Sequence, residues 1–178
     1  MAGQISEKLR IKAAKVRLLV LDVDGVMTDG RIIMDDEGRE IKAFDVRDGH
    51  GIKLLRQAGI EVAMLTGRNS PVVQKRADDL GIPWVRQGVH DKVAAYEEIV
   101  GEKGIKDEES CFVGDDLVDI TLLKRVGVPI CVADGVQEAK DTALYVTQCP
   151  GGRGAVREVC ELLLKAQGRW EEIIRWHG

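Results

Sequence analysis

The chain has 178 residues, of which 44% are hydrophobic and 31% charged, and its formal net charge at pH 7 is −4. This composition is typical of a folded globular protein and excludes a disordered chain. The absence of a basic block argues against a nucleic-acid partner, and no apolar run approaches the roughly 18 residues of a transmembrane helix. The charged N-terminus is unlike a signal peptide, so we expect a cytoplasmic protein with no membrane contact.

Short apolar runs alternate with helical patterns after residue 15, within one predicted domain spanning residues 1–178. This alternation predicts a Rossmann-like α/β fold, in which helices cover both faces of a mostly parallel sheet. We expect strands at 16–21, 61–66, 84–87, 110–113, 129–132 and 145–147. We expect helices at 52–58, 70–80, 92–100, 117–125 and 155–166. Ser70-Pro71 is a helix start, and Gly59 and Gly81 stand where helices should end.

The predicted first strand ends in Asp22-Val23-Asp24-Gly25, which places two carboxylates one residue apart at a glycine turn. Side chains two residues apart in an extended run share a face, and buried acids need a metal or hydrogen bonds to balance their charge. A calcium loop is the simplest interpretation, but Val26 and Met27 stand where an EF-hand needs an oxygen ligand and a glycine. The pattern favours a nucleophilic aspartate beside a second acid and a divalent cation.

Residues 31–44 interrupt the alternation. Two extended runs, 31–34 and 40–44, flank an acidic turn closed by Gly38, which predicts a projecting β-hairpin. The hairpin is either a solvated flap or a subunit contact, because exposed sheet edges are commonly covered. The intervals between 24 and 52 and between 66 and 92 are too short for a cap domain. We therefore expect a capless site, open to large substrates unless another subunit closes it.

Polar residues also follow the later strands, and ligands of open α/β sheets bind beyond the carboxyl ends of the strands. Each residue alone has an ordinary alternative as a turn, a solvated helix start, a cap or a first-turn acid. Counting Asp22 and Asp24 after the first strand, however, four polar groups occur in this order, which is hard to explain by accident. The set comprises Thr66, Gly67, Arg68 and Asn69 after the second strand, Lys92 at a helix start, and Asp115, Asp116 and Asp119 after the fourth strand.

These residue types suit phosphoryl transfer. Asp22 would attack phosphorus to give an aspartyl phosphate that water hydrolyses, and Asp24 would protonate the leaving oxygen and then activate the water. Thr66 and Lys92 would hold phosphate oxygens, and Asp115 would complete a Mg²⁺ site.

Arginines that follow Thr66 suggest an acidic substrate, since the planar guanidinium pairs well with a carboxylate. Together with Gly67 and Asn69, Arg68 and Arg76 are the predicted substrate-binding residues, and the expected substrate is a small phosphorylated sugar acid. For Arg76, and for Arg86 further along the chain, a solvated surface position is the alternative.

The motifs DxDGVxTDG, LTGR, Lys92 and GDDxxD resemble the four motifs of the haloacid dehalogenase superfamily of phosphatases, over nearly the whole chain. Residues 42–49 (KAFDVRDG) and 151–159 (GGRGAVREV) resemble, more specifically, the 3-deoxy-D-manno-octulosonate 8-phosphate phosphatases. The resemblance implies Mg²⁺ bound by Asp22, the backbone carbonyl of Asp24 and Asp115, with Asp116 and Asp119 behind these ligands. It also implies a cytoplasmic homotetramer, with active sites near subunit interfaces, that serves lipopolysaccharide synthesis in Gram-negative bacteria.

Three other functions remain as alternatives. A phosphatase of a nine-carbon keto sugar acid 9-phosphate is the nearest. A receiver domain has its acidic pair early and its phosphorylated aspartate on a middle strand, which is the opposite order. A non-catalytic scaffold does not explain why Asp22, Asp24, Lys92 and Asp115 are all present. The aromatic tail at about 168–178 is less familiar, so its role stays open.

The four cysteines show no metal-binding or redox spacing. We expect structural, unpaired thiols, as in a reducing compartment. They are Cys111, Cys131, Cys149 and Cys160.

Overall fold

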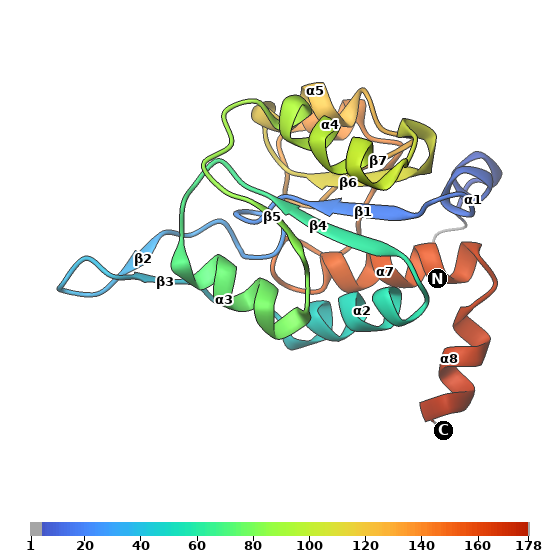
Figure 1. Ribbon diagram of the computed structural model, residues 1–178, viewed down its shortest axis with the longest axis horizontal. Helices are drawn as coiled ribbons and strands as arrows, with labels where there is room; N and C mark the ends of the chain where they lie inside the picture. The colour runs from blue at the N-terminus through green and yellow to red at the C-terminus, as the bar shows by residue number, and fades with distance from the viewer. Residues whose placement is uncertain (1–4, 178) are drawn as a thin grey trace.

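The structure is a computed structural model that describes residues 5–177, so residues 1–4 of the predicted domain and residue 178 of the expected tail lie outside it. Its centre is a six-stranded parallel sheet in the order β5-β4-β1-β6-β7-β8 (Figure 1). The strands are β1 (Leu18–Leu21), β4 (Glu61–Leu65), β5 (Trp84–Arg86), β6 (Ser110–Gly114), β7 (Val128–Cys131) and β8 (Tyr145–Val146). Each predicted strand is present, displaced by two residues at most at either end.

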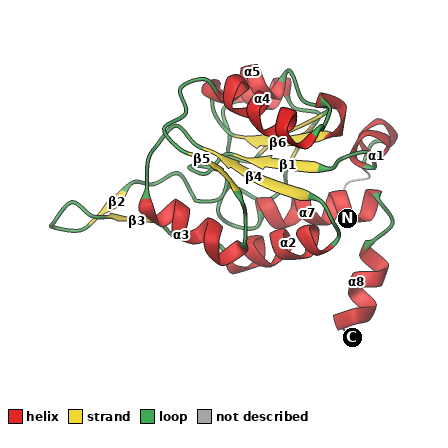
Figure 2. Ribbon diagram, viewed as in Figure 1, coloured by secondary structure: helices red, strands yellow, loops and turns green. Residues whose placement is uncertain are grey.

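The central strand β1 shows why the sheet needs helices on both faces. Its side chains alternate, so that Leu19 and Leu21 enter one core cluster while Leu18 and Val20 enter the other. One face is covered by α1 (Glu7–Ala13), α2 (Val46–Gln57), α3 (Pro71–Leu80) and α7 (Ala155–Ala166). The other is covered by α4 (Lys92–Lys103), α5 (Ile120–Leu123) and α6 (Gln137–Thr142) (Figure 2). The predicted α/β class is confirmed.

Helix boundaries depart from the prediction where glycines or turns hide the helical pattern. Helix α2 begins at Val46 rather than 52, because Asp45 caps it and accepts a hydrogen bond from Arg47 N at 2.7 Å. Gly51 lies where α2 packs closely on α7, since a Cβ there would lie 3.2 Å from Arg157 Cα. The predicted helix 117–125 is a 3-10 turn, η2 (Leu117–Asp119), followed by α5. Helices α1, α6 and α8 (Trp170–His177) had no counterpart in the prediction.

The predicted helix-ending glycines are confirmed, and the predicted cap is confirmed in position only. Gly81 ends α3 in a left-handed conformation with φ 67°, and Gly59 follows α2 with φ 82°. Ser70 stands at the cap position of α3 and Pro71 at its first turn, but the Ser70 side chain makes no capping hydrogen bond.

The predicted hairpin consists of β2 (Ile33–Met34) and β3 (Glu40–Ile41), paired antiparallel and separate from the main sheet. It projects from the end of the molecule at which α3 begins (Figure 1). Its apolar side chains Ile33, Met34 and Ile41 are exposed. Between β1 and α2 the chain contains only this hairpin, and between β4 and α4 only α3 and β5, so the capless architecture is confirmed.

All four cysteines are free, and three of them are buried: Cys111, Cys131 and Cys160. Within residues 5–177, no helix combines the length and apolar character needed to cross a bilayer.

Candidate active site

A buried ammonium group joins two carboxylates beyond the carboxyl ends of β1 and β6. Asp22 directly follows β1, and Lys92 is the first residue of α4, which Asp91 caps. Lys92 Nζ lies 3.1 Å from Asp22 Oδ2 and donates a hydrogen bond to Asp119 Oδ1 at 2.6 Å. The side chain of Lys92 is 5% exposed and that of Asp119 is 0% exposed. Such charges are tolerated inside a protein because they compensate one another.

Burial and charge set the protonation of this group. Burial raises the pKa of Asp22 to about 6; Lys92 lowers it and Asp119 raises it. Burial opposes the charge of Lys92, but the attraction of Asp22 and Asp119 outweighs this and raises the pKa of the ammonium. Lys92 is therefore a fixed positive charge beside a carboxylate that is ionised at neutral pH.

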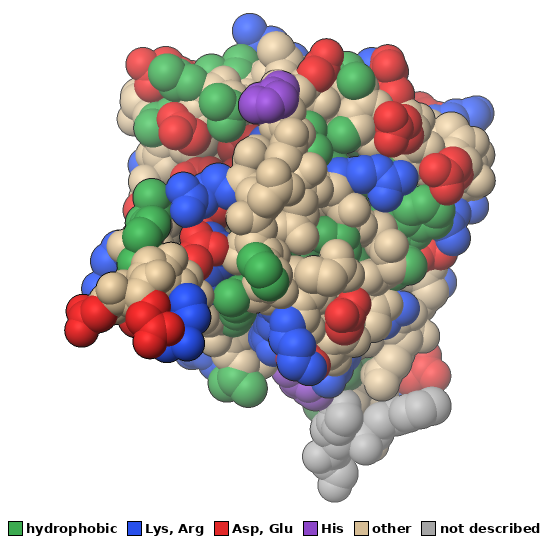
Figure 3. Space-filling view, turned by 60° about the vertical axis from the view of Figure 1, so that its left-hand side comes forward, with side chains coloured by type: hydrophobic (Ala, Val, Ile, Leu, Met, Phe, Trp, Pro, Cys, Tyr) green, Lys and Arg blue, Asp and Glu red, His purple; other side chains and the backbone are tan. Residues whose placement is uncertain are grey.

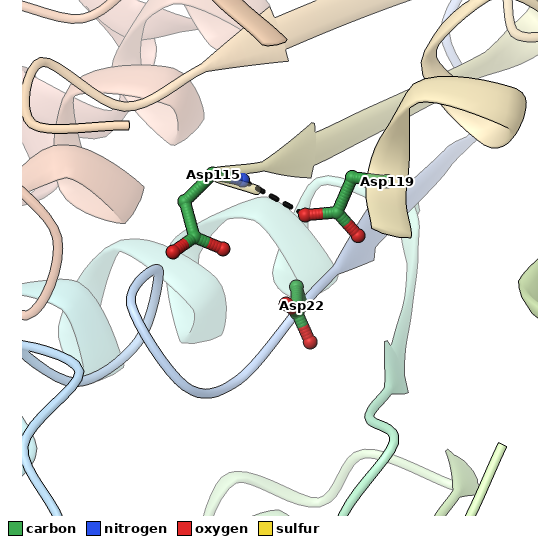
Figure 4. Close-up of side chains that lie close together, drawn as sticks. All are labelled: Asp22, Asp115 and Asp119. Atoms are coloured by element: carbon green, nitrogen blue, oxygen red, sulfur yellow. Dashed lines mark hydrogen bonds between the residues drawn. The ribbon is translucent and has the colours of Figure 1, made fainter. Parts of the chain in front are cut away.

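Asp115, which follows β6, completes an acidic triad with Asp22 and Asp119 (Figure 4). One carboxylate oxygen from each residue lies within 4.8 Å of the others. Burial, then the charges of Asp22, Asp119 and Asp116, raise the pKa of Asp115 to about 8. Asp115 Oδ1 is buried and has no hydrogen-bond partner among the residues that the structure describes.

The three acids differ in how free their oxygens are. Asp119 Oδ1 binds Lys92, and its Oδ2 accepts a hydrogen bond from Asp115 N at 2.9 Å. Asp22 Oδ1 accepts a hydrogen bond from Val23 N at 2.7 Å and its Oδ2 lies 3.1 Å from Lys92 Nζ, whereas Asp115 Oδ1 has no partner among the described residues. Carboxylate oxygens are the ligands that Mg²⁺ prefers, so Asp22 and Asp115 fit a divalent cation, and Asp119 fits a supporting position behind them.

Asp24 lies in the tight turn that follows β1. Met27 N donates to Val23 O at 2.9 Å and closes the turn. Gly25 has φ 89°, and a Cβ there would lie 2.0 Å from Asp115 Oδ2. Only glycine allows both this conformation and this close approach, so the turn can lie directly against the Asp115 carboxylate.

These acids open onto a cavity of about 350 Å³. Thr66, at the end of β4, is 2% exposed, and its Oγ1 accepts a hydrogen bond from Arg68 N at 3.3 Å. Gly67 and Arg68 also line the cavity, as predicted. Asp116 lines it as well, while its side chain caps η2 by accepting from Leu117 N at 2.7 Å. Lining residues that the sequence analysis missed are Val89, His90 and Val118.

The hairpin supplies two charged residues that were also missed. Lys42, whose side chain is 2% exposed, donates a hydrogen bond to Asp24 Oδ1 and lies 3.2 Å from Glu40 Oε1. Glu40 accepts a hydrogen bond from Arg68 at 2.8 Å, and Arg68 Nε lies 3.8 Å from Asp24 Oδ2. Burial would raise the pKa of Glu40, but the neighbouring Ser70, Arg68 and Lys42 side chains lower it to about 2. Four alternating charges thus connect the hairpin to the cavity.

Three predicted or considered residues lie elsewhere in this chain. Asn69 is exposed and outside the lining of the cavity. Arg76 donates to Asp45 O at 3.3 Å and stacks on the Phe44 ring at 5.4 Å, so it joins α3 to the start of α2. Arg86 pairs with glutamates on α4. The face seen in Figure 3 carries acidic and basic side chains interspersed with one another.

The arrangement meets the needs of phosphoryl transfer. Asp22 supplies an ionised oxygen, Lys92 and Thr66 supply a positive charge and a hydroxyl beside it, and Asp24 supplies an acid one residue away. Asp22 and Asp115 fit a cation that would neutralise the transferred group.

Comparison with known proteins finds matches across the chain. Residues 48–127 match the family model of the haloacid dehalogenase-like hydrolases. The chain is 45% identical over 169 residues to the 3-deoxy-D-manno-octulosonate 8-phosphate phosphatase of Yersinia pestis, covering 95% of this chain and 90% of that protein. The crystal structure of the phosphatase of the same name from Moraxella catarrhalis, in complex with magnesium ion, phosphate ion and KDO, is 41% identical. It superposes with a TM-score of 0.94 over 96% of this chain and 98% of that one.

Proposed function

Because the chain belongs to the 3-deoxy-D-manno-octulosonate 8-phosphate phosphatases, within the haloacid dehalogenase-like hydrolases, we propose that it hydrolyses this phosphomonoester to the free sugar acid and phosphate. The observation that carries the proposal is the buried pair of Asp22 and Lys92, which lines the cavity together with Asp24 and Thr66 and is held from behind by Asp119.

In the proposed reaction, an Asp22 oxygen attacks phosphorus while the bond from phosphorus to the ester oxygen breaks. Asp24 gives a proton to that leaving oxygen. It later takes a proton from the water whose oxygen attacks phosphorus, which breaks the bond from phosphorus to Asp22, releases phosphate and restores the Asp22 carboxylate. Lys92 and Thr66 hold the phosphoryl oxygens, whose charge grows in the transition state. Asp119 keeps Lys92 in place through the 2.6 Å hydrogen bond.

Mg²⁺ is the proposed cofactor, held by Asp22, Asp115 and the backbone carbonyl of Asp24. The unpartnered, buried Asp115 Oδ1 supports this assignment, as does the magnesium ion in the Moraxella catarrhalis structure. When bound, the cation neutralises charge on the phosphoryl group and on the two carboxylates.

The substrate class is supported by the relatives and by Arg68. The Moraxella catarrhalis structure holds the eight-carbon sugar acid, which is the product of the proposed reaction. Arg68 is half exposed at the cavity, and the proposed role of its guanidinium is to bind the carboxylate of the sugar acid. A nine-carbon keto sugar acid 9-phosphate is the second candidate, since it carries the same two charged groups.

Assembly and location complete the proposal. We propose a homotetramer built largely through the hairpin at about 31–44, with the active sites near subunit interfaces. The exposed Ile33, Met34 and Ile41 and the missing cap support it. Light scattering on a variant in which a short glycine-serine loop replaces the hairpin tests it, and a tetramer that survives would place the interface elsewhere. The proposed setting is the cytoplasm of a Gram-negative bacterium, in lipopolysaccharide synthesis.

A panel of phosphorylated sugar acids, with phosphate release as the readout, tests the function. The eight-carbon 8-phosphate should have the highest kcat/KM. A higher value for the nine-carbon 9-phosphate would favour the second candidate. Failure to hydrolyse any phosphomonoester in the presence of Mg²⁺ would contradict the proposal as a whole.

A further inference from the structure

The loop of residues 151–154 contacts the turn that carries Asp24. This loop is the start of the second family-specific segment. Gly152 N donates a hydrogen bond to Val26 O at 2.9 Å. A Cβ on Gly151 would lie 1.7 Å from Gly25 O, and one on Gly152 would lie 2.4 Å from the Thr28 carbonyl carbon. Both obstacles are backbone atoms, which cannot swing aside as a flexible side chain does, so the two loops are in direct backbone contact.

The other side of this loop is fastened to α2 through the first family-specific segment. Asp48 is 2% exposed and accepts hydrogen bonds from Gly154 N at 3.4 Å and Arg157 N at 2.7 Å. It therefore binds the first turn of α7, where free backbone N–H groups favour a carboxylate. The segments 42–49 and 151–159 are more than 100 residues apart in the chain, yet Asp48 joins them.

The turn that carries Asp24 also lies against the carboxylate of Asp115. Gly25 lies so close to Asp115 that a Cβ would meet Asp115 Oδ2 at 2.0 Å. The backbone of residues 25–28 thus contacts the 151–154 loop, and Gly25 also contacts the carboxylate of Asp115. A displacement of Gly25 would move the Asp24 carbonyl, which belongs to the adjoining peptide, and would change the distance between the turn and Asp115.

We propose that Gly151 is a positioning residue for the cation site: its lack of a side chain, within a loop fastened by Asp48, sets the distance between the Asp24 turn and Asp115. This inference rests on the proposed function, because it assigns the site a divalent cation. The loop itself touches neither substrate nor cation. It acts by holding the backbone that does.

Gly151→Ala tests the inference cleanly, because the backbone of Gly151 is outside the left-handed region and alanine adds only the obstructing Cβ. Mg²⁺ binding is measured by isothermal titration calorimetry at a temperature where circular dichroism shows every variant folded. We expect the Kd for Mg²⁺ to rise at least about tenfold, as for other supporting positions around metals, and kcat to fall. Gly101→Ala in α4, with no described heavy atom within 4 Å of the added Cβ, should stay within about twofold of wild type.

A milder variant covers the case in which Gly151→Ala does not fold. Asp134→Ala removes one exposed carboxylate and, with it, the hydrogen bond that Asp134 Oδ1 accepts from Gly151 N at 2.8 Å. Its Kd for Mg²⁺ should rise about threefold or more, in line with the loss of one modest hydrogen bond.

The possible outcomes distinguish a failure of the proposed function from a failure of the Gly151 inference. Wild-type protein that binds no Mg²⁺ would contradict the proposed function and the inference together. If the wild-type protein binds Mg²⁺ and a folded Gly151→Ala variant binds it with equal affinity, the inference alone is overturned. If Gly151→Ala does not fold, an Asp134→Ala variant with an unchanged Kd for Mg²⁺ would overturn it in the same way. A purely structural loop would lower the melting temperature without changing the metal affinity of the folded protein.

Discussion

Replacing Lys92 by methionine should damage stability and activity together, because the side chain keeps its length and loses only its charge. The ammonium lies 3.1 Å from Asp22 and 2.6 Å from Asp119, and its side chain is 5% exposed. Lys92→Met leaves two buried carboxylates facing one another without a cation. Without the ammonium, nothing offsets the desolvation cost of these carboxylates.

The expected loss in the free energy of unfolding is about 3–5 kcal/mol, the usual cost of removing one partner from a buried ion pair. This is a large fraction of the roughly 5–15 kcal/mol by which a domain is stable. Adding Asp119→Asn to Lys92→Met should restore at least about 1 kcal/mol, because it removes one of the two unpaired charges. The kcat should fall at least about a hundredfold, since a charge beside the transferred phosphoryl group is lost.

Urea unfolding in Mg²⁺-free buffer at neutral pH measures the stability, and phosphate release measures the activity. Lys103→Met is the matched control. Lys103 pairs with Glu61 at 2.8 Å, but both side chains are about one-third exposed, so the loss should stay below about 1 kcal/mol. If Lys92→Met lost no more free energy of unfolding than Lys103→Met, the assignment of a buried ion-pair network would be wrong. If stability fell but kcat did not, Lys92 would not bind the phosphoryl group.

The remaining predictions concern the nucleophile, the cation, the substrate and pH. Asp22→Asn should fold normally by circular dichroism and lose at least about a hundredfold in kcat, because an amide cannot attack phosphorus; greater residual activity in a preparation free of wild-type enzyme would refute the nucleophile. Phosphate release should require a divalent cation, with Mg²⁺ sufficient and Ca²⁺ poor because of its longer bonds and larger ligand number, and full activity after exhaustive chelation would exclude the metal. Arg68→Glu sets a second carboxylate beside Glu40, now 2.8 Å from Arg68, and should cost at least about tenfold in kcat/KM on the eight-carbon ester but little on an aryl phosphate; equal losses would assign Arg68 to phosphate binding. Burial raises the pKa of Asp48 from 3.8 to about 6, so the folded state holds a proton that the unfolded state releases, and stability should fall by about 3 kcal/mol as pH rises from about 4 to 6. Urea unfolding across this range should show that contribution in wild type and not in Asp48→Asn.

The strand-end residues could be predicted from the sequence because their placement follows from the sheet. Leu18–Leu21 is an unbroken apolar run, typical of a strand buried on both faces, and parallel strands bring their carboxyl ends to one edge. Once the alternation of strands and helices is recognised, it therefore predicts that Asp22, Thr66 and Asp115 lie close together. The roles of these residues in catalysis stay predictions, supported by the geometry.

Residues whose position depends on helix direction or on the hairpin could not be predicted in this way. Arg76 is ten residues from Thr66 in sequence, but it is five residues into α3, which carries it about 8 Å along the helix axis toward α2. Lys42 and Glu40 are far from Asp24 in the chain, and the fold of the hairpin back onto the cavity has no local signal. The start of α2 was missed because Gly49 and Gly51 weaken the helical pattern, although in the structure both lie where α2 packs closely against its neighbours.

The strand order of the sheet has a consequence for how the enzyme acquires its activity. Strand β1 pairs with β6, so Leu18 lies beside Ser110, with more than half of the chain between them. Parallel pairings of this separation must close long loops before they gain contacts, which makes folding slow relative to local structure. Asp22 meets Lys92, Asp115 and Asp119 only after that closure, whereas the helices need no such meeting. During refolding, phosphate release should therefore return later than the helical circular dichroism signal. The delay between the two signals would measure how long β6 takes to pair with β1.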